Sequence, residues 1–278
     1  MVRDSNSEAV SEVEVSAGDE TTTSDAQGLF RLELPPTDRL VVNFTKAGYV
    51  AASKVTKAPS GQSIHLEPVV TRYEHVDTIS AVDGGLVQTA DGAAVDIGPD
   101  ALVDSTGSIY SGPATIAITT FDPTTETGLN SFPGDFEGVT TSGETVPFES
   151  YGFVDITILD DEGDTLQLAP GQTASTRIPI APSLVALAPS SIPLWFYGST
   201  DGKWREEGSA TKIDDVYEGE LSHFTPWNID VRVEEFCTVR GRVVDSNGNP
   251  IRGATVLIRA TAGAVWSAGD TSIGEDGT

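Results

Sequence analysis

The stretch FVDITIL, residues 153–159, indicates the fold class of this chain. Its apolar residues Val154, Ile156 and Ile158 alternate with polar ones. Because successive side chains of a β-strand point to opposite faces of a sheet, a period of two predicts a strand with one buried face. This stretch therefore favours a β-protein over a helical one.

Similar runs recur along the sequence and are separated by Gly- and Asp-containing turns such as DGG, ADG, DEGD and TDGKW. Short runs at this spacing are typical of β-sandwiches, and no stretch has the apolar period of a long helix. We expect an all-β protein with antiparallel sandwiches. The further strands that we predict lie at 30–34, 40–44, 114–121, 165–168, 173–180, 192–197 and 227–233.

The composition limits the partners and the chemistry. The 278 residues include 42 acidic and 16 basic ones, for a formal net charge of −26, which repels nucleic acid and anionic membranes. A lone cysteine, Cys237, excludes an internal disulfide and a thiolate zinc cluster. No run approaches the ~18 apolar residues of a membrane span, and the first residues lack the apolar core of a signal peptide.

Two segments of the chain resemble each other. VRDSNSEAVSEVEV starts at Val2 and VVDSNGNPIRGATV starts at Val243; each predicts a strand, an Asp-Ser-Asn turn and a second strand. The second segment is preceded by FCTVRGR, residues 236–242, which has no counterpart before Val2, and it stops where a strand matching 30–34 would begin. We expect two incomplete copies of one module within a piece of a longer, exported chain.

The motifs in these copies resemble the carboxypeptidase regulatory-like domain. They are V-x-D-x-x-G-x-P-x-x-G-A-x-V at 243–256, T-x-x-D-x-x-G-x-F at 22–30 and K-A-G-Y at 46–49. The resemblance implies a small transthyretin-like β-sandwich without catalytic residues, a module common as a repeat in secreted and cell-surface proteins. It assigns residues 1–70 to a first copy that lacks its first strand and residues 236–278 to a truncated second copy.

Residues 71–235 carry a second resemblance. The motifs FPGDF, ESYGFVDITILDDEGDTLQLAPG and IPLWFYGSTDGKW, followed by HFTPWN, are similar to the ectodomain core shared by cartilage intermediate layer protein and the astroprincin membrane proteins. The opening part resembles a ZU5 domain. The resemblance implies a larger sandwich in an extracellular matrix or at a cell surface, which spaces, adheres to or binds a protein or glycan. An accessory region of a secreted hydrolase is an alternative.

The common catalytic motifs are missing from the sequence. No H-E-x-x-H, G-x-x-x-x-G-K-[ST], G-x-G-x-x-G or G-x-S-x-G occurs. His65 and Glu67 form an H-x-E pair on one side of a possible strand, without a third metal ligand nearby in sequence. We therefore expect no enzyme activity that turns over repeatedly and no cofactor other than calcium.

Calcium is a candidate at two turns because hard cations prefer oxygen ligands. Both turns also suit a hairpin in which Gly or Asn takes a positive φ, and neither completes an EF-hand. The candidate ligands are Asp160, Asp161, Glu162 and Asp164 in the first turn and Asp245, Asn247 and Asn249 in the second.

The tryptophans give a candidate glycan surface. Exposed indole rings stack on sugars, whereas large aromatic residues of a sandwich most often fill its core. The four residues concerned are Trp195, Trp204, Trp227 and Trp266.

The triplet His223-Phe224-Thr225 offers the most specific chemistry. ZU5-containing adaptors and adhesion-receptor ectodomains that cleave themselves carry His-Phe-Ser or His-Leu-Thr, so the resemblance implies that Thr225 attacks the Phe224 carbonyl with His223 as base. The alternative is a corner of the sandwich, in which Pro226 favours an extended Thr225 and Phe224 and Trp227 fill the core.

The C-terminal segment supplies only two strands and a turn, which are marginal on their own in water. We expect this segment to be poorly packed unless residues 237–243, CTVRGRV, pair with the open edge of the first copy, which would give contacts between 237–244 and 10–45. Without these contacts the segment would form a separate hairpin.

Overall fold

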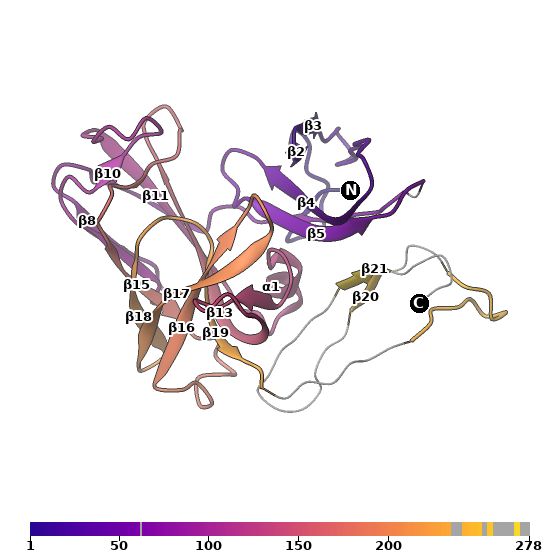
Figure 1. The fold of residues 1–278 in the computed structure, drawn as a ribbon. Coiled ribbons are helices and arrows are strands. Elements are labelled where there is room, and N and C mark those ends of the chain that lie inside the picture. The colour runs from indigo at the N-terminus through magenta and orange to yellow at the C-terminus, as the bar shows by residue number, and fades with distance from the viewer. Residues whose placement is uncertain (62, 235–240, 252–254, 258–269, 273–278) are drawn as a thin grey trace.

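The computed structural model describes residues 1–61, 63–234, 241–251, 255–257 and 270–272 (Figure 1). Strands make up 48% of the chain and helix 2%, which confirms the expected all-β class. In the described ranges the helical element is α1 (Glu126–Ser131), which begins at Thr125, whose hydroxyl oxygen accepts a hydrogen bond from the Gly128 amide. No helix in these ranges is long and apolar enough to cross a membrane.

The N-terminal unit has one four-stranded antiparallel sheet in the order β3-β2-β4-β5. Its strands are β2 (Glu14–Ala17), β3 (Glu20–Thr23), β4 (Thr37–Thr45) and β5 (Ala52–Ala58). A short parallel pair is formed by β1 (Arg3–Asp4) and β6 (Val69–Val70), and Val70 is buried in the same core as the sheet residues. All buried members of this core, which we call the N-terminal core, come from residues 2–70: Val2, Val10, Val13, Val15, Ala17, Val42, Phe44, Tyr49, Ala52 and Val70.

The expected strand at residues 40–44 is confirmed as part of β4, but the expected strand at 30–34 is not formed. Phe30, Leu32 and Leu34 are half-buried and pack against the N-terminal core, as their alternation predicts. Residues 30–34 are nevertheless not assigned to any strand. Alternation therefore predicted the buried face correctly, although no described strand pairs with this backbone.

The middle unit is a sheet of eleven strands. Ten of them follow the order β7-β11-β13-β19-β16-β17-β18-β15-β9-β8, and β12 pairs with both β13 and β17. The strands are β7 (His75–Ser80), β8 (Gly85–Gln88), β9 (Ala94–Ile97), β11 (Pro113–Phe121), β12 (Glu137–Val139), β13 (Thr145–Leu159), β15 (Ala174–Pro179), β16 (Ser191–Gly198), β17 (Lys203–Ile213), β18 (Val216–Leu221) and β19 (Trp227–Arg232). A bridge between Ser80 and Gly84 joins its two ends, so the sheet curls around its core.

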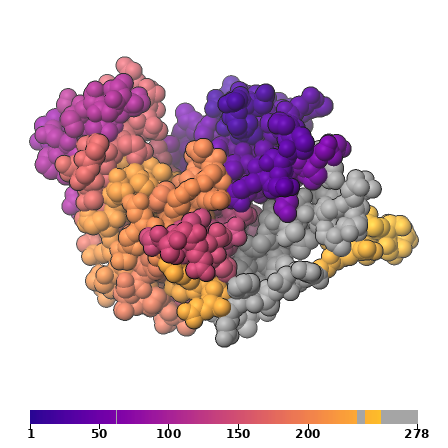
Figure 2. All heavy atoms as spheres, in the orientation of Figure 1, coloured from indigo at the N-terminus to yellow at the C-terminus, as the bar shows by residue number. Residues whose placement is uncertain are grey.

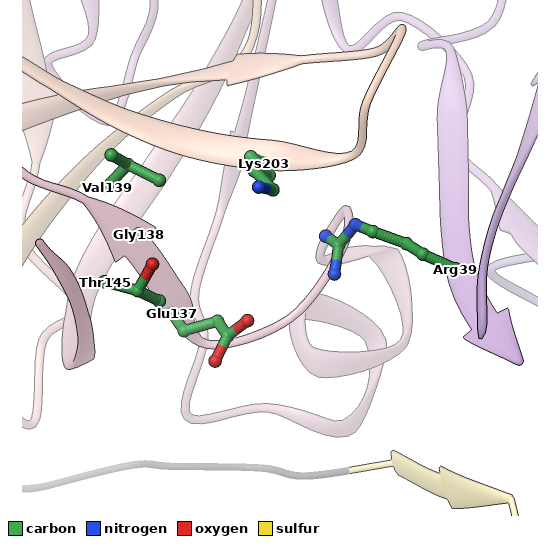
Figure 3. A pocket seen from close by; sticks show the side chains of 6 residues that line it. All are labelled: Arg39, Glu137, Gly138, Val139, Thr145 and Lys203. Atoms are coloured by element: carbon green, nitrogen blue, oxygen red, sulfur yellow. The ribbon is translucent and has the colours of Figure 1, made fainter. Parts of the chain in front are cut away.

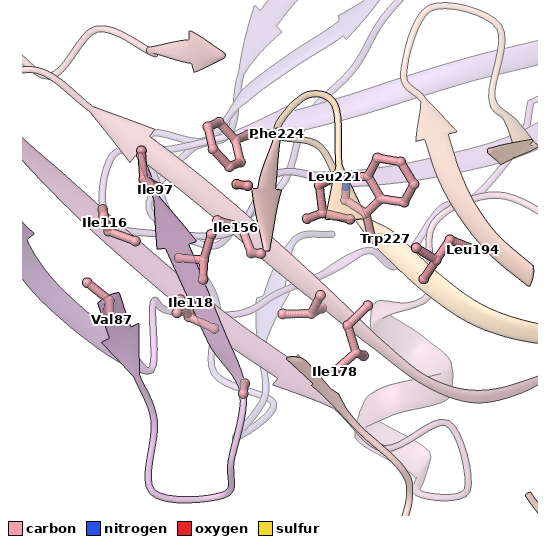
Figure 4. Packing of buried hydrophobic residues seen from close by; sticks show 14 of the residues in the cluster. Val87, Ile97, Ile116, Ile118, Ile156, Ile178, Leu194, Leu221, Phe224 and Trp227 are labelled. Atoms are coloured by element: carbon pink, nitrogen blue, oxygen red, sulfur yellow. The ribbon is translucent and has the colours of Figure 1, made fainter. Parts of the chain in front are cut away.

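The stretch at residues 153–159 forms the second half of β13, which pairs with β11 on one side and β19 on the other. Its alternating residues Val154, Ile156 and Ile158 are buried in the main core of the middle unit. Ile156 lies there among residues from several strands, including Ile116 and Ile118 of β11 (Figure 4). The central position of β13 explains why its sequence has the clearest strand pattern.

The other predicted strands of the middle unit are also present, with small shifts at their ends. They correspond to β11, β15, β16 and β19, whereas the strand predicted at 165–168 is reduced to β14 (Gln167–Leu168), which pairs with β10 (Leu102–Val103). The pattern did not predict β17 and β18, because both strands mix polar and charged residues with few apolar ones.

A third core, rich in aromatic residues, contains residues of both units. Phe121 and Phe153 stack with ring centroids 4.5 Å apart, and Phe132 meets Phe153 edge-on at 5.1 Å. Val50 of the N-terminal unit is buried in the same cluster. Its buried members are Val50, Phe121, Phe132, Phe148, Phe153, Trp195, Tyr197 and Trp204.

The described part of the C-terminal segment contains β20 (Thr255–Leu257) and β21 (Asp270–Ser272), which pair with each other. No hydrogen bond or bridge joins residues 241–244 to residues 10–45. Residues 237–240 of the expected contact lie outside the described residues, so the expected pairing with the first copy stays a prediction.

Candidate functional site

The His223-Phe224-Thr225 triplet forms the corner between β18 and β19. Phe224 is 4% exposed and Trp227 is fully buried, and both belong to the main core (Figure 4). The apolar side chains on both sides of Thr225 therefore fix the corner by burial, as the sandwich-corner interpretation predicts. The polar side chains of the triplet remain at the edge of this core.

Gln167 of β14 holds the backbone of this corner. The Phe224 amide donates to Gln167 Oε1 at 2.8 Å, and Gln167 Nε2 donates to the Phe224 carbonyl oxygen at 2.9 Å. The side-chain amide thus satisfies both backbone groups of the residue before the candidate scissile bond. Sequence reasoning did not find Gln167, because it lies 57 residues away and no local motif marks it.

Aromatic rings surround the His223 imidazole. The ring stacks on Trp227 with centroids 4.9 Å apart and meets Phe196 edge-on at 4.6 Å. Trp227 Nε1 also donates to the His223 carbonyl oxygen at 3.1 Å, which fixes the backbone beneath the ring. Loss of hydration in this setting lowers the pKa of His223, and the nearby Glu207 opposes the shift. The imidazole is therefore neutral at neutral pH, the form that can accept a proton.

The hydroxyl of Thr225 and the carboxylate of Glu207 lie on opposite sides of the imidazole. Thr225 Oγ1 is 3.3 Å from His223 Nδ1, and Glu207 Oε2 is 4.0 Å from His223 Nε2. Glu207 comes from β17, a strand that sequence reasoning did not predict, and it also accepts a hydrogen bond from Ser222. A carboxylate that contacts an imidazole, which in turn contacts a hydroxyl, is the arrangement that activates the hydroxyl as a nucleophile.

These contacts fit an acyl shift at the Phe224–Thr225 bond. Thr225 Oγ1 would attack the Phe224 carbonyl carbon, His223 would take the hydroxyl proton, and Gln167 Nε2 already donates to the oxygen on which negative charge develops. The backbone at the triplet shows neither a positive φ nor a cis bond. The geometry thus supplies the reacting groups without visible backbone strain.

The two calcium candidates are turns in which an aspartate bonds the local backbone. Asp160 Oδ1 accepts from the amides of Glu162 and Asp164 at 2.9 and 2.8 Å. Asp245 Oδ1 accepts in the same way from Asn247 and Asn249, both at 2.8 Å. Asp245 Oδ2 also accepts from Asn249 Nδ2 at 3.0 Å, so one carboxylate oxygen of Asp160 and both of Asp245 are already used within their turns.

The same turn recurs after Asp4, Asp25 and Asp104, each of which accepts two backbone amides through Oδ1. It is a general way in which this protein reverses its chain, so its presence at Asp4 and Asp245 does not by itself mark a repeat. Within the described ranges no three His, Cys, Asp or Glu side chains come together in a way that could hold a metal ion. Calcium at Asp160 or Asp245 stays a prediction.

Three of the four tryptophans are buried in the cores. Trp195, Trp204 and Trp227 are each 0% exposed, and Trp204 Nε1 donates to the Pro133 carbonyl oxygen at 2.9 Å. Rings without exposed faces cannot stack on a sugar, so the core interpretation holds for these three. Trp266 lies outside the described residues.

A small hollow of about 160 Å³ lies where β4 of the N-terminal unit approaches β12 and β17 (Figure 3). Arg39 reaches toward it from the N-terminal unit, while Lys203 and Glu137 line it from the middle unit. Ligand pockets typically enclose roughly 300 Å³ or more. The hollow is therefore a gap at the junction of the two units rather than a site for a sizeable ligand.

The chain was compared with protein-family models, with curated proteins and with solved structures, and none of the three comparisons found a match.

Proposed function

We propose that this protein is a non-catalytic β-sandwich array that spaces or binds at a cell surface or in an extracellular matrix. The observation that carries the proposal is the junction between the two sandwiches, because it joins them through buried side chains rather than through a linker alone. A module that holds a fixed distance or presents a fixed surface needs such a junction.

Side chains of β4 and β5 make the polar part of the junction. Arg39 Nε donates to the Asp201 carbonyl oxygen at 3.0 Å, and its Nη2 donates to the Gly202 carbonyl oxygen at 2.7 Å. The Ser53 and Tyr197 hydroxyl oxygens lie 2.8 Å apart in a buried position. Burial raises the pKa of Tyr197 to about 12, so its hydroxyl keeps its proton and can donate throughout the physiological range.

Close backbone approach completes the junction. A Cβ on Gly202 would lie 2.5 Å from Val55 Cγ2 and 2.9 Å from Val41 Cγ2, so the turn between β16 and β17 can reach the N-terminal sheet only with glycine at this position. The space-filling view shows the indigo N-terminal unit directly against the orange part of the middle unit (Figure 2). The two sandwiches therefore pack as one body.

The charge of the chain points to the kind of partner. A net charge of −26 disfavours anionic glycans and favours a basic protein surface or a neutral glycan. A binding screen of the purified chain against matrix proteins and glycans tests this half of the proposal, at two salt concentrations because charge steering weakens with salt. Binding to a basic protein that weakens with salt would support it. A folded chain without any binding partner would leave only the spacing role.

A second candidate function is a single self-cleavage at Phe224–Thr225. The contact between Thr225 Oγ1 and His223 Nδ1 favours it, together with the Gln167 donor on the Phe224 carbonyl oxygen. The hydroxyl attacks the carbonyl carbon, the C–N bond breaks to give an ester and a free Thr225 amine, and water hydrolyses the ester. The intact mass of purified protein tests it, because a single stable species at 29.2 kDa would exclude cleavage. Thr225→Ala should abolish any smaller fragment.

A further inference from the structure

The two end strands of the eleven-stranded sheet, β7 and β8, meet at one bridge. Ser80 at the end of β7 pairs with Gly84 just before β8, and the Gly84 amide donates to the Ser80 carbonyl oxygen at 2.9 Å. Beyond this bridge, among the described strands, β7 pairs only with β11 and β8 pairs only with β9. The sheet is therefore an open barrel with a seam between the free edges of β7 and β8.

The free edge of β8 presents unpaired backbone groups to the seam. In an antiparallel pair, every second residue directs its amide and carbonyl toward the same neighbouring strand. The Thr89 amide donates to the Ala93 carbonyl oxygen at 2.8 Å on the β9 side, whereas the Gly84 amide points to β7. The odd-numbered residues of β8 thus bond β9, while Leu86 and Gln88 direct their backbone groups into the seam.

The free edge of β7 is protected by an aspartate. By the same alternation Val76 and Thr78 direct their backbone groups into the seam, but Asp77 Oδ1 already accepts the Thr78 amide at 2.8 Å. Charged side chains along an edge strand are a common protection against strand addition. Strand β8, with the sequence GLVQ, carries no charged residue. Of the two edges, β8 is therefore the one open to an additional strand.

Apolar side chains border the seam on both faces of the sheet. Val87 of β8 points into the main core (Figure 4), and Ile79 of β7 packs against the same core. On the outer face Leu86 is 57% exposed and Val76 is 53% exposed. Figure 1 shows β8 on the side of the middle unit that faces away from the N-terminal unit. A strand in the seam would remove this apolar surface from water, which favours its binding.

Charge decides which kind of segment the seam can accept. Residues 73–176, which include β7, β8 and β9, contain 18 acidic residues and neither lysine nor arginine. Exposed carboxylates stand in β7, in the turn before β8, in the turn after it and on β9 opposite Leu86: Asp77, Asp83, Asp91 and Asp96. Such a surface attracts a basic segment and repels an acidic one.

We propose that the free edge of β8 is a docking site for an extended, basic segment of a partner protein, in which lysine or arginine alternates with apolar residues. The segment adds a strand to β8 by bonding the amides and carbonyls of Leu86 and Gln88. Its apolar side chains face the core beside Val87. Its basic side chains lie on the outer face, where their aliphatic stems cover Leu86 and their charged ends approach Asp96.

The same charges disfavour a second copy of the chain as the added strand. The edge of β8 in a second copy is bordered by the same carboxylates, and each copy has a net charge of −26. Like charges that face each other across paired strands are destabilising. The inference rests on the binding half of the proposed function, for which it names the surface and the chemistry of the partner.

Amide hydrogen exchange of the wild-type chain tests the site without any variant. The probe is a short peptide of alternating lysine and valine, and exchange is followed residue by residue in ¹H–¹⁵N spectra. In the free chain the amides of Leu86 and Gln88 should exchange rapidly, whereas the Val87 amide, bonded to β9, should exchange slowly. The peptide should slow exchange at Leu86 and Gln88 by about tenfold or more and change Val87 little.

Two results of this experiment would overturn the proposal. Slow exchange of Leu86 and Gln88 in the free chain would show that the seam is already closed. Peptide binding that leaves both amides in rapid exchange would show attraction by charge alone, without an added strand.

Substitutions at Leu86 separate the backbone contact from the side chain. Leu86→Pro removes the amide that faces the seam and leaves the pairing with β9 intact, as proline allows at a sheet edge. Leu86→Ala is the matched control, because it keeps the amide. Fluorescence anisotropy of the labelled peptide should show binding weakened about tenfold by Leu86→Pro and less by Leu86→Ala. A peptide of alternating glutamate and valine should not bind.

Equal losses for the two variants, or equal binding of the glutamate peptide, would contradict strand addition at β8. The same variants also separate this site from the proposed function. A basic matrix protein that binds the wild-type chain and binds Leu86→Pro equally well would overturn the site and leave the proposed binding function standing.

Discussion

The hydroxyl oxygens of Ser53 and Tyr197 lie 2.8 Å apart in the buried junction between the two sandwiches. Ser53 is 4% exposed and Tyr197 is 2% exposed, so neither hydroxyl can exchange this partner for bulk water. A buried polar group that loses its partner costs about 1–3 kcal/mol. The bond therefore makes the packing of the two units specific as well as stable.

Tyr197→Phe should lower the free energy of unfolding by about 1–2 kcal/mol, because it leaves the Ser53 hydroxyl without its partner. Urea denaturation followed by tryptophan fluorescence measures the change. Tyr110→Phe is the matched control, because its hydroxyl bonds the Pro113 carbonyl oxygen and Asp161 at an exposed position where water can replace it, and it should change stability by less than about 0.5 kcal/mol. Equal effects of the two variants would count against a buried hydroxyl pair.

Gly202→Ala should weaken the junction more than an ordinary glycine replacement. The added Cβ would meet Val55 at 2.5 Å, and the residue has a φ of +68°, so steric overlap adds to backbone strain. Gly171 has a similar φ of +83°, and a Cβ added there would have no atom within 4 Å. Gly171→Ala therefore measures the effect of backbone strain alone. We expect Gly202→Ala to lose about 1–3 kcal/mol more than Gly171→Ala in thermal or urea unfolding. Similar losses would mean that the two units do not touch at Gly202.

The buried Asp155 should make the protein less stable as the pH rises from about 4 to 6. Burial raises the pKa of this carboxyl to about 6, above its ordinary value of 3.8, although Thr157 donates a hydrogen bond to it. Below pH 4 the Asp155 carboxyl is protonated in both the folded and the unfolded chain. Above pH 6 it is ionised in both, and in the folded chain this charge is buried. The buried charge lowers the free energy of unfolding at neutral pH by up to about 3 kcal/mol. Asp155→Asn should therefore stabilise the chain at pH 7 relative to wild type and much less at pH 4. An equal effect at both pH values in urea unfolding would show that the carboxyl stays ionised.

Cleavage at Phe224–Thr225, where it occurs, should slow as the pH falls. The base form of His223 is the neutral one, and its pKa is below the ordinary 6.5 because the ring is partly desolvated. The rate should thus be constant at pH 7 to 8 and decline only at acid pH, below the ordinary histidine pKa of 6.5. Intact mass spectrometry against time gives the rate, with Thr225→Ala as the uncleaved control. Cleavage that accelerates in acid would point to simple hydrolysis instead of attack by Thr225.

Local patterns in the sequence predicted much of the fold, because a strand that is buried on one face has apolar residues at every second position. This holds for β13, where Val154, Ile156 and Ile158 are buried as expected, and for β4. The same pattern at residues 30–34 predicted burial but not pairing, because pairing depends on a neighbouring strand that the sequence of one segment cannot specify. At the candidate corner, the sequence predicted the triplet 223–225 but not the distant residues that contact it.

The partners of that triplet come from distant parts of the chain. Gln167 and Glu207 lie on β14 and β17, and only the folding of the large sheet brings them to Phe224 and His223. Neither residue stands in a motif, so no spacing rule could have identified them. The junction at Tyr197 was missed for the same reason.

The distance distribution between two spin labels tests most directly whether the two sandwiches form one rigid body. Labels at Thr21→Cys on β3 and Leu86→Cys on β8, in a Cys237→Ser background, place one probe on an exposed site of each unit. Pulsed electron paramagnetic resonance should give a single narrow distance for this chain, and a broader one when Arg39→Ala and Tyr197→Phe are added. A distribution that is already broad without these substitutions would contradict the rigid array, and with it the proposed spacing function.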